Sequence, residues 1–490
     1  MIERSGVVSL IEERIAAHQV KPGRPRELSV RALLVALLTN AREGHLYLIE
    51  VPGFLNALRT RERQRLGVGR TGKVTRRQVE SLYGLISGSL RGDGDGLDSF
   101  DEVCHRLLAA SSHADTKSRR DIAIDGTSIA SWGTYRAVKK ARKGAKAGER
   151  VPTDPDARWR GKGVDAWKRP VFGYDLTLSV TIPDPTGRPV ALSATSMRFR
   201  PAGTQTIPMA LAVALDTARD RGGLGDVIAD REYTQRIDGA DFILPLRALG
   251  AEPVFQLKST QQGGRGTQRG ALVIDGQPYS PALPDGLRDL RMPAVNAPLA
   301  ALAEYQRKIG LREKYRLIPH GSRKADGSQV YQCPAAAGRL RCPLVAGSQL
   351  LALGTMPAFP PMNPMPGSIC TRKYSTFAAD ELPLSQREQY GSFDWYVSMN
   401  RRNRVEGFFG NLKDRARENV TRGAIRVMGL VKTGLLVAMA VASLNLRLAD
   451  KWDDGRVEAT TVKKMGRPRK QGVAAYVQAF ALPSTGPPVE

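Results

Sequence analysis

Hydrophobic and polar positions alternate most regularly in the middle of the chain. Residues 174–182 and 189–197 form two alternating runs separated by Pro-Asp-Pro-Thr-Gly-Arg, which predicts a β-hairpin. A short alternating run at 121–127 precedes the hairpin, a helical pattern at 207–219 follows it, and residues 227–230 are again apolar. This order of strand, hairpin, helix and strand predicts an α/β fold with a mixed sheet flanked by helices.

Helical periodicity dominates the first 110 residues. One face of an early helical pattern carries four leucines: Leu33, Leu34, Leu37 and Leu38. Thr75 is placed to cap a later helix that turns Arg76 and Arg77 outward. The inward positions of that helix are apolar: Val79, Leu82, Leu85 and Ile86. A short basic helix after a glycine-rich turn is typical of a helix-turn-helix recognition helix, and an ordinary amphipathic helix explains the same pattern.

The pattern changes after residue 240. Runs at 242–246 and 254–258 each predict a strand, one of which would complete the sheet. The apolar segment 433–444 is too short to span a bilayer, which predicts a buried core helix. We divide the chain into a helical domain (1–110), the first part of the core (118–260), a large, mostly β or irregular insertion (261–394), the C-terminal helices of the core (395–450) and a basic flexible tail (451–490).

Composition suggests a partner and a compartment. The 490 residues are 41% hydrophobic, as in a soluble globular protein, and their formal net charge of +26 favours a polyanionic partner. Ribosomal, membrane-surface and nucleic-acid-binding proteins share such a charge. Acidic residues at Glu3, Glu12 and Glu13 interrupt any signal peptide, and four cysteines are too few for a disulfide framework, so we expect a cytoplasmic protein.

The cysteines leave two interpretations open. Cys333, Cys342 and Cys370, together with His320, could bind zinc. The eight residues between Cys333 and Cys342 make a wider gap than a typical zinc knuckle has, which favours scattered structural thiols.

Residues 399–414 combine charge with a hydrophobic stripe. Taken as one helix, the segment brings Arg402, Glu406 and Lys413 within a narrow arc. The adjoining arc is apolar: Val405, Phe408, Phe409 and Leu412. A carboxylate between two cations beside a core suits a site that binds metal and phosphate together. A surface ion pair next to a buried stripe explains the same pattern.

Two aspartates upstream make the first interpretation more specific. Asp125 and Asp230 each follow a short apolar run, so we expect both at strand ends, where side chains leave the sheet and can converge. Either one alone is more often a turn residue or a helix cap. Two strand-end Asp residues and the helical Glu406, however, can hold two divalent ions about 4 Å apart.

At this point the chain resembles the DDE transposases of bacterial insertion sequences. Arg402, Glu406 and Lys413 match the family's Tyr-x2-Arg-x3-Glu-x6-Lys signature, with Met399 at the tyrosine position. Asp125-Gly-Thr is similar to the first acidic motif of the family. The resemblance covers about residues 121–448, with the insertion as an interruption.

The second acidic motif is similar as well: it is Asp230-Arg-Glu-Tyr here, whereas relatives often have Gly in place of Glu232. The resemblance implies an RNase H-like core in which Asp125, Asp230 and Glu406 are catalytic and bind two Mg²⁺ ions, with Mn²⁺ able to substitute. It also implies metal-dependent cleavage and strand transfer of insertion-sequence ends. The expected partners are double-stranded DNA, as terminal inverted repeats and target, and a second protomer in the DNA complex; no membrane is expected.

The resemblance implies that the basic residues bind DNA. It also implies a cytoplasmic, nucleoid-associated protein. Residues 136–169, with 12 Lys and Arg against 4 Asp and Glu, are expected to grip the backbone near the scissile phosphate. Residues 463–470 contain Gly-Arg-Pro flanked by cations, a pattern typical of an AT-hook. The expected DNA-binding side chains are Arg402, Lys413, Arg76, Arg77, Lys139, Lys140, Arg142, Lys143, Arg467 and Arg469. The insertion is expected to cover the site as a lid or clamp.

Two other functions remain open. A catalytically silent, domesticated DNA-binding protein would keep the charge without the chemistry, and the three acids argue against it. A structure-selective nuclease of the same fold would cleave DNA but never join strands.

Overall fold

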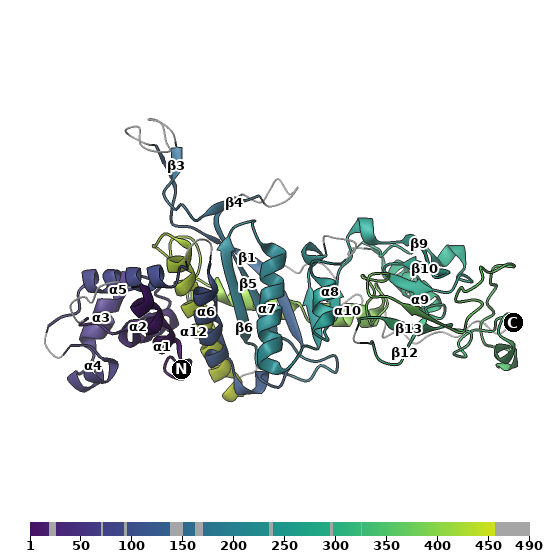
Figure 1. Cartoon of the computed structure of the whole chain (residues 1–490), viewed down its shortest axis with the longest axis horizontal. Helices are drawn as coiled ribbons and strands as arrows, with labels where there is room; N and C mark the ends of the chain where they lie inside the picture. The colour runs from purple at the N-terminus through teal and green to yellow at the C-terminus, as the bar shows by residue number, and fades with distance from the viewer. Residues whose placement is uncertain are drawn as a thin grey trace. The chain divides into compact units, whose positions relative to one another are not determined.

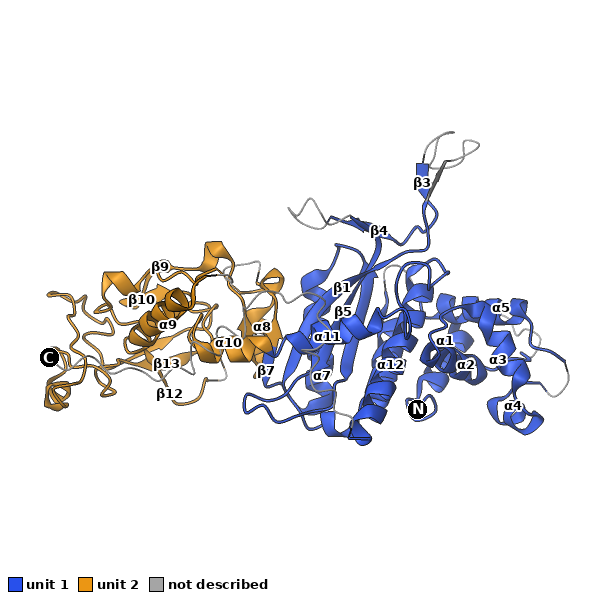
Figure 2. Ribbon diagram, turned by 180° about the vertical axis from the view of Figure 1, so that it is seen from behind, with its two compact units in different colours: residues 1–227, 401–457 blue, residues 228–400, 458–490 orange. Residues whose placement is uncertain are grey.

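The computed structural model describes residues 1–18, 26–69, 72–92, 96–137, 150–161, 170–234, 239–294, 297–324 and 326–455. The chain divides into two compact units, shown in blue and orange in Figure 2. Unit 1 contains Met1–Val227 and Arg401–Val457, and unit 2 contains Ile228–Asn400 and Glu458–Glu490. The predicted five-part division is finer than these two units and stays a prediction.

The N-terminal part of unit 1 is helical, as predicted. Its helices are α1 (Val7–His18), α2 (Val30–Arg42), α3 (Val51–Ala57), α4 (Thr60–Leu66), α5 (Arg76–Ser89) and α6 (Asp98–Ser111). Ser29 caps α2 by accepting a hydrogen bond from the Ala32 N–H at 3.0 Å. Thr75 caps α5 as expected, and the Gln78 side chain completes a reciprocal capping box.

A curled mixed sheet contains the central strands of unit 1, together with β8 and the second half of β7, which are assigned to unit 2 (Figure 1). Its strands are β1 (Ile122–Ala130), β4 (Arg158–Arg160), β5 (Val171–Thr181), β6 (Ala194–Pro201), β7 (Asp226–Ala229) and β8 (Glu252–Phe255). The path is β4-β5-β1-β7-β8, with β6 also paired to β5, and the division between the units falls inside β7. The predicted hairpin is confirmed as the antiparallel pair β5 and β6. A second, two-stranded sheet pairs β2 (Tyr135–Ala137) with β3 (Arg150–Pro152).

Helices cover both faces of this sheet. Helix α7 (Thr206–Arg221), predicted at 207–219, bonds to one face through Thr217, whose hydroxyl lies 3.0 Å from that of Ser179. Lys413, after helix α11 (Asn403–Leu412), contacts Thr127 on the other face. The strand register shows that these are opposite faces. Ser179 pairs with Ile124, so their side chains point to the same face, whereas the side chain of Thr127, three residues after Ile124, points to the other.

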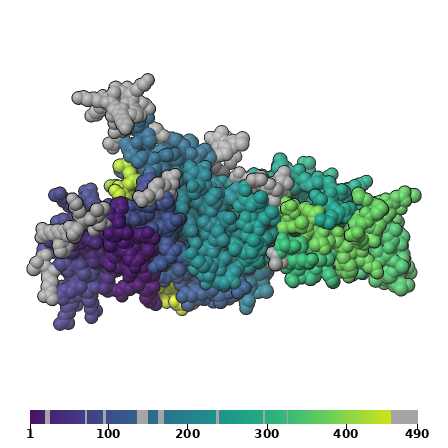
Figure 3. Space-filling model, in the orientation of Figure 1, coloured from purple at the N-terminus to yellow at the C-terminus, as the bar shows by residue number. Residues whose placement is uncertain are grey.

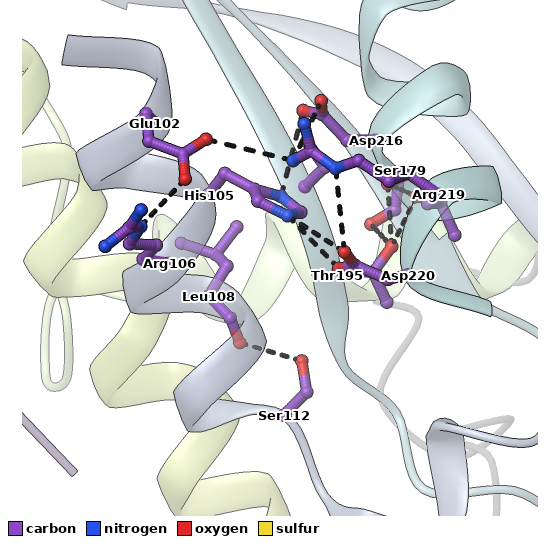
Figure 4. A network of polar contacts seen from close by, with 12 residues as sticks. Glu102, His105, Arg106, Leu108, Ser112, Ser179, Thr195, Asp216, Arg219 and Asp220 are labelled. Atoms are coloured by element: carbon purple, nitrogen blue, oxygen red, sulfur yellow. Dashed lines mark hydrogen bonds and ion pairs between the residues drawn. The ribbon is translucent and has the colours of Figure 1, made fainter. Parts of the chain in front are cut away.

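A network of polar contacts joins α6, β6 and α7, and Figure 4 shows the part of it around His105, Asp216 and Asp220. His105 of α6 lies 3.1 Å from an Asp220 oxygen of α7. Arg198 of β6 donates to Asp216 of α7 at 2.6 Å and lies 3.2 Å from Asp101 of α6. The largely buried Arg198 guanidinium thus has two carboxylate partners of opposite sign, which is what allows these charges to be buried.

Helix α12 (Leu430–Asp453) packs against α2, α5, α6 and β6. It is longer than the predicted segment 433–444, and among the described residues it alone is long and apolar enough to cross a membrane. However, 83% of its most apolar window is buried, so the predicted core helix is confirmed. At Gly434, any side chain would clash with the rings of Phe100 and Phe199, so only glycine permits this close approach.

Unit 2 has its own hydrophobic core, which includes Tyr279, Leu317 and Phe377. Around it lie β9 (Gly264–Gln268), β10 (Ala271–Ile274), β11 (Gln277–Tyr279), α9 (Leu299–Glu313), β12 (Ile318–His320), β13 (Gln329–Gln332) and β14 (Tyr374–Phe377). Helices α8 (Ile243–Ala248) and α10 (Phe393–Asn400) complete the unit.

The strand predicted at 242–246 is wrong, because these residues lead into helix α8. Its buried side chains are Ile243, Leu246 and Arg247, which have the spacing of a helix rather than the alternation of a strand. The strand predicted at 254–258 is confirmed in part as β8, which pairs with β7.

Candidate functional site

Asp125 lies within strand β1 rather than at its end, which corrects the prediction. It is the fourth of nine residues, because Gly126 to Ala130 continue the antiparallel pairing with β5. Its carboxylate accepts a hydrogen bond from the Gly126 N–H at 2.8 Å. The side chain is half-buried and points to the same face as Thr127.

The predicted helix over residues 399–414 is interrupted. Helix α10 ends at Asn400, and α11 begins at Asn403, with Arg401 and Arg402 in a turn between them. Arg402 is therefore the N-cap residue of α11 rather than part of its interior. The expected apolar stripe is confirmed, because the buried residues of α11 are Val405, Phe408, Phe409 and Leu412.

Arg402 and Glu406 form an ion pair along the first turn of α11. The guanidinium Nη2 lies 2.5 Å from Glu406 Oε1, and the Glu406 side chain is 47% exposed. Glu406 thus has the accessibility that a ligand-binding carboxylate needs, and one of its oxygens is engaged by a cation. A surface ion pair next to a buried stripe was the simpler of the two interpretations of residues 399–414.

Lys413 connects α11 to the strand that carries Asp125. Its ammonium group donates to the hydroxyl of Thr127, which lies two residues after Asp125 on the same face of β1. The two partners are 286 positions apart in the chain. The structure therefore brings Lys413 to the face of the sheet that carries Asp125 and Thr127.

Arg401 anchors the start of α11 and was missed by the sequence analysis. Its guanidinium donates to Asp121, just before β1, at 3.0 Å, and to Asp226 at the start of β7. Only 8% of the Arg401 side chain is exposed. Burial raises the pKa of Asp121, with the Asp226 charge adding to this effect and the Asp226 N–H and Arg401 opposing it.

A regular spacing signalled this anchor in the sequence. Asp121 precedes Asp125 by four positions, and Asp226 precedes Asp230 by four positions. In each case one aspartate belongs to a predicted acidic motif, and the other lies where the same strand begins: Asp121 just before β1 and Asp226 as the first residue of β7. Arg401 therefore links the beginnings of β1 and β7 to the N-terminus of α11, whose first turn carries Glu406.

Asp230 belongs to unit 2 and follows the last residue of β7 directly. Its side chain accepts a hydrogen bond from the Arg231 N–H at 2.5 Å and caps the short helix η3 (Arg231–Tyr233). The strand-end position is confirmed. A helix cap was the alternative to a metal ligand for a single aspartate after a strand, and Asp230 has this capping role.

Carboxylate oxygens are the ligands that Mg²⁺ takes in proteins, so Asp125, Asp230 and Glu406 fit this ion by donor type. Within the described ranges, no group of three or more His, Cys, Asp or Glu side chains is close enough together to hold a metal ion. This statement includes the cysteines proposed for zinc. Cys333 and Cys342 are buried in the core of unit 2, and burial raises the pKa of Cys370 to about 11.

The predicted DNA-binding residues are placed only in part. Arg76 and Arg77 lie exposed at the start of α5, where Arg76 pairs with Glu80 at 2.7 Å. Six others lie outside the described residues: Lys139, Lys140, Arg142, Lys143, Arg467 and Arg469. The structure adds a stacked cation, because the Arg426 guanidinium lies 4.8 Å from the ring centroid of Tyr47 and 5.4 Å from that of Trp132.

Comparison of the sequence with protein-family models and with curated proteins gives no match.

Proposed function

We propose that this protein is a DNA transposase with an RNase H-like core, which cleaves insertion-sequence ends and transfers the strands in a metal-dependent reaction. The proposal rests chiefly on the contact between Lys413 and Thr127. Through this contact a helix with Arg, Glu and Lys at the signature spacing packs beside the strand of the first acidic motif. The resemblance is based on residue spacing in two separate motifs. The contact brings together Lys413 and Thr127, which are 286 positions apart in the chain.

The order of strands supports the same proposal. An antiparallel hairpin of β5 and β6 lies on one side of β1, and β7 and β8 follow on the other side in the sheet order. Helix α7 connects β6 to β7. This order of strand, hairpin, helix and strand is the one expected of an RNase H-like sheet and so supports the proposal, in which β8 would be the completing strand.

In the proposed reaction Asp125, Asp230 and Glu406 would hold Mg²⁺. The bound metal supplies an activated attacking oxygen and stabilisation of the leaving oxygen. The protein's own cations have a separate role, in which Lys413 and Arg402 would bind nonbridging phosphate oxygens and hold the DNA strand in line for attack. Thr127 positions the Lys413 ammonium, and Arg401 positions the helix that carries Glu406.

Specific observations favour a second candidate, a catalytically silent DNA-binding protein. Glu406 is bound by Arg402, and Asp230 serves as a helix cap. Within the described ranges no three His, Cys, Asp or Glu side chains form a group that could hold a metal ion. The charge of +26 would then serve DNA binding alone.

Cleavage of a labelled DNA fragment that carries the sequences flanking the gene tests the proposal. With Mg²⁺ or Mn²⁺, the wild-type protein should nick at the element boundary, and Glu406→Gln should abolish nicking while DNA affinity stays within about threefold, because the phosphate-binding cations remain. Joining of the cut ends to a target plasmid then distinguishes a transposase from a nuclease.

Glu304→Gln is the matched control. Glu304 is also a helical glutamate bound to an arginine, 2.8 Å from Arg307, and its side chain is 48% exposed. The same loss of one negative charge at that position should leave cleavage unchanged. Tight binding by the wild-type protein without cleavage in either metal would overturn the transposase proposal in favour of the silent protein.

A further inference from the structure

Exposed hydrophobic side chains gather on one segment of unit 2. Six of the fourteen large hydrophobic side chains that are exposed in the described chain fall between residues 344 and 365. These six define the apolar patch: Leu344, Leu350, Leu353, Phe359, Met362 and Met365. Met362 is 95% exposed and Leu350 is 90% exposed. Single exposed hydrophobics are ordinary, whereas a group of this size usually marks an interaction surface.

The backbone beneath the apolar patch is anchored. Arg341 and Pro357 form a parallel bridge, and the Ala358 N–H donates to the Arg341 carbonyl at 2.7 Å. The buried Ser348 hydroxyl accepts from the Cys342 N–H at 2.8 Å. Ala358 is buried in the core of unit 2, while the next residue, Phe359, is 79% exposed. The backbone is therefore anchored at residues 341–342, 348 and 357–358, between and beside which the side chains of the apolar patch are exposed.

The segment also carries no charged side chain. Residues 342–371 contain no Asp, Glu, Lys, Arg or His, in a chain that is 25% charged and carries +26 overall. DNA is a poor occupant for this surface, because binding a polyanion requires cations. Two copies of a chain with a charge of +26 repel each other over most of their surfaces, and they approach at least electrostatic cost through an uncharged face.

We propose that the apolar patch is a self-association surface on which a second copy of this chain docks. The same patch on both copies makes a symmetric interface of the isologous kind. Phe and Met are enriched in the buried centre of such interfaces. The green surface of unit 2 in Figure 3 includes this part of the chain.

Size and stiffness both fit a protein interface. The segment 344–365 has 22 residues, within the range of roughly 20–30 residues that one partner contributes to a standard interface. Four prolines restrict its backbone: Pro357, Pro360, Pro361 and Pro364. A backbone that is already restricted loses less conformational entropy when it binds.

Sedimentation velocity of the full-length protein without DNA tests this surface, and its outcome is independent of the transposase proposal. The wild-type protein should sediment as a dimer over about 1 to 100 μM. The variant Leu353→Arg/Met362→Arg places like charges across the interface and should weaken dimerisation at least about tenfold. Both residues are almost fully exposed, at 87% and 95%, so the variant should keep the wild-type circular dichroism and melting temperature.

Ile49→Arg is the control, because Ile49 is 56% exposed in unit 1 and the change adds the same kind of charge. It should leave the dimer intact. A wild-type protein that is monomeric throughout, or a dimer that persists in the double variant, contradicts the proposal. Monomeric protein that binds phosphatidylserine-containing vesicles through the apolar patch would instead assign the surface to a membrane.

Discussion

Asp216 shows how single charges stabilise unit 1. Burial alone raises the pKa of this carboxyl, but the hydrogen bond and charge of Arg198, the Ser196 hydroxyl and His105 outweigh it and hold the pKa below its ordinary value. A carboxylate whose pKa is lower in the folded state binds fewer protons there than in the unfolded state. It therefore stabilises the fold above the unfolded pKa of about 4, and this contribution is lost as the pH falls through the folded value.

Asp216→Asn should lower the free energy of unfolding by about 1.5–3 kcal/mol at pH 7, because it removes a charged hydrogen-bond acceptor from a buried network. Urea denaturation at a series of pH values measures the difference. The gap between wild type and variant should stay constant from pH 7 to about 5 and shrink below about pH 4. A gap that widens on acidification would show that the pKa shift has the opposite sign.

Residues differ in how far their roles can be predicted. The burial of Phe408 and Leu412 follows from helical periodicity, which the sequence displays directly. The position of Asp125 in mid-strand depends on how far β5 continues to pair with β1, and this partner comes more than 40 residues later. Arg401 was missed because its partners Asp121 and Asp226 lie 280 and 175 positions away.

At the scale of elements, α11 is the helix on which the candidate site depends. It lies against β1 and β5, and both of its ends are fixed by cations, Arg401 before the first turn and Lys413 after the last. The sequence predicted one longer helix because Arg401 and Arg402 are compatible with helical periodicity. Instead, residues 401 and 402 form a turn, in which Arg401 contacts the carboxylates of Asp121 and Asp226.

Arg401→Met should destabilise the protein by about 3–5 kcal/mol, because it leaves Asp121 and Asp226 buried without their shared cation. Arg402→Met removes a cation of the same size from a pair whose Glu406 is half exposed, and should cost no more than about 1 kcal/mol. Equilibrium urea unfolding of the two variants gives the comparison. Equal losses would mean that the buried cluster does not anchor the helix.

Elements with long regular patterns were predicted well, and short apolar runs were not. The hairpin β5–β6 and helices α2, α7 and α12 each repeat their period several times. The run at 242–246 is too short to distinguish a strand from a helical turn, and α8 resolves it through packing in unit 2.

At the scale of the whole molecule, net charge is the property most directly linked to the proposed partner. A charge of +26 should make DNA binding strongly dependent on salt, because each neutralised phosphate releases counterions. With six to ten phosphate contacts, affinity should fall by about 10³–10⁵ between 50 and 200 mM salt. Fluorescence anisotropy with labelled duplex DNA measures the slope.

Arg415→Ala, at an exposed cation after α11, should reduce that slope by about 1, whereas Arg307→Ala in unit 2 should leave it unchanged because Arg307 is already paired with Glu304. An affinity that does not change with salt would exclude phosphate contacts as the main source of binding.

The division of unit 1 into two stretches of chain has a consequence for biosynthesis. Strands β1, β5 and β6 leave the ribosome before residues 228–400, and α11 and α12 leave after them. At translation rates of about 5–20 residues per second, the 173 residues from 228 to 400 delay these helices by roughly 9–35 s. During that interval Lys413 has not yet reached the sheet face that carries Asp125, and Arg401 has not yet reached Asp121 and Asp226. Residues 401–453 therefore complete a sheet face of unit 1 whose strands β1 and β5 were synthesised before residues 228–400.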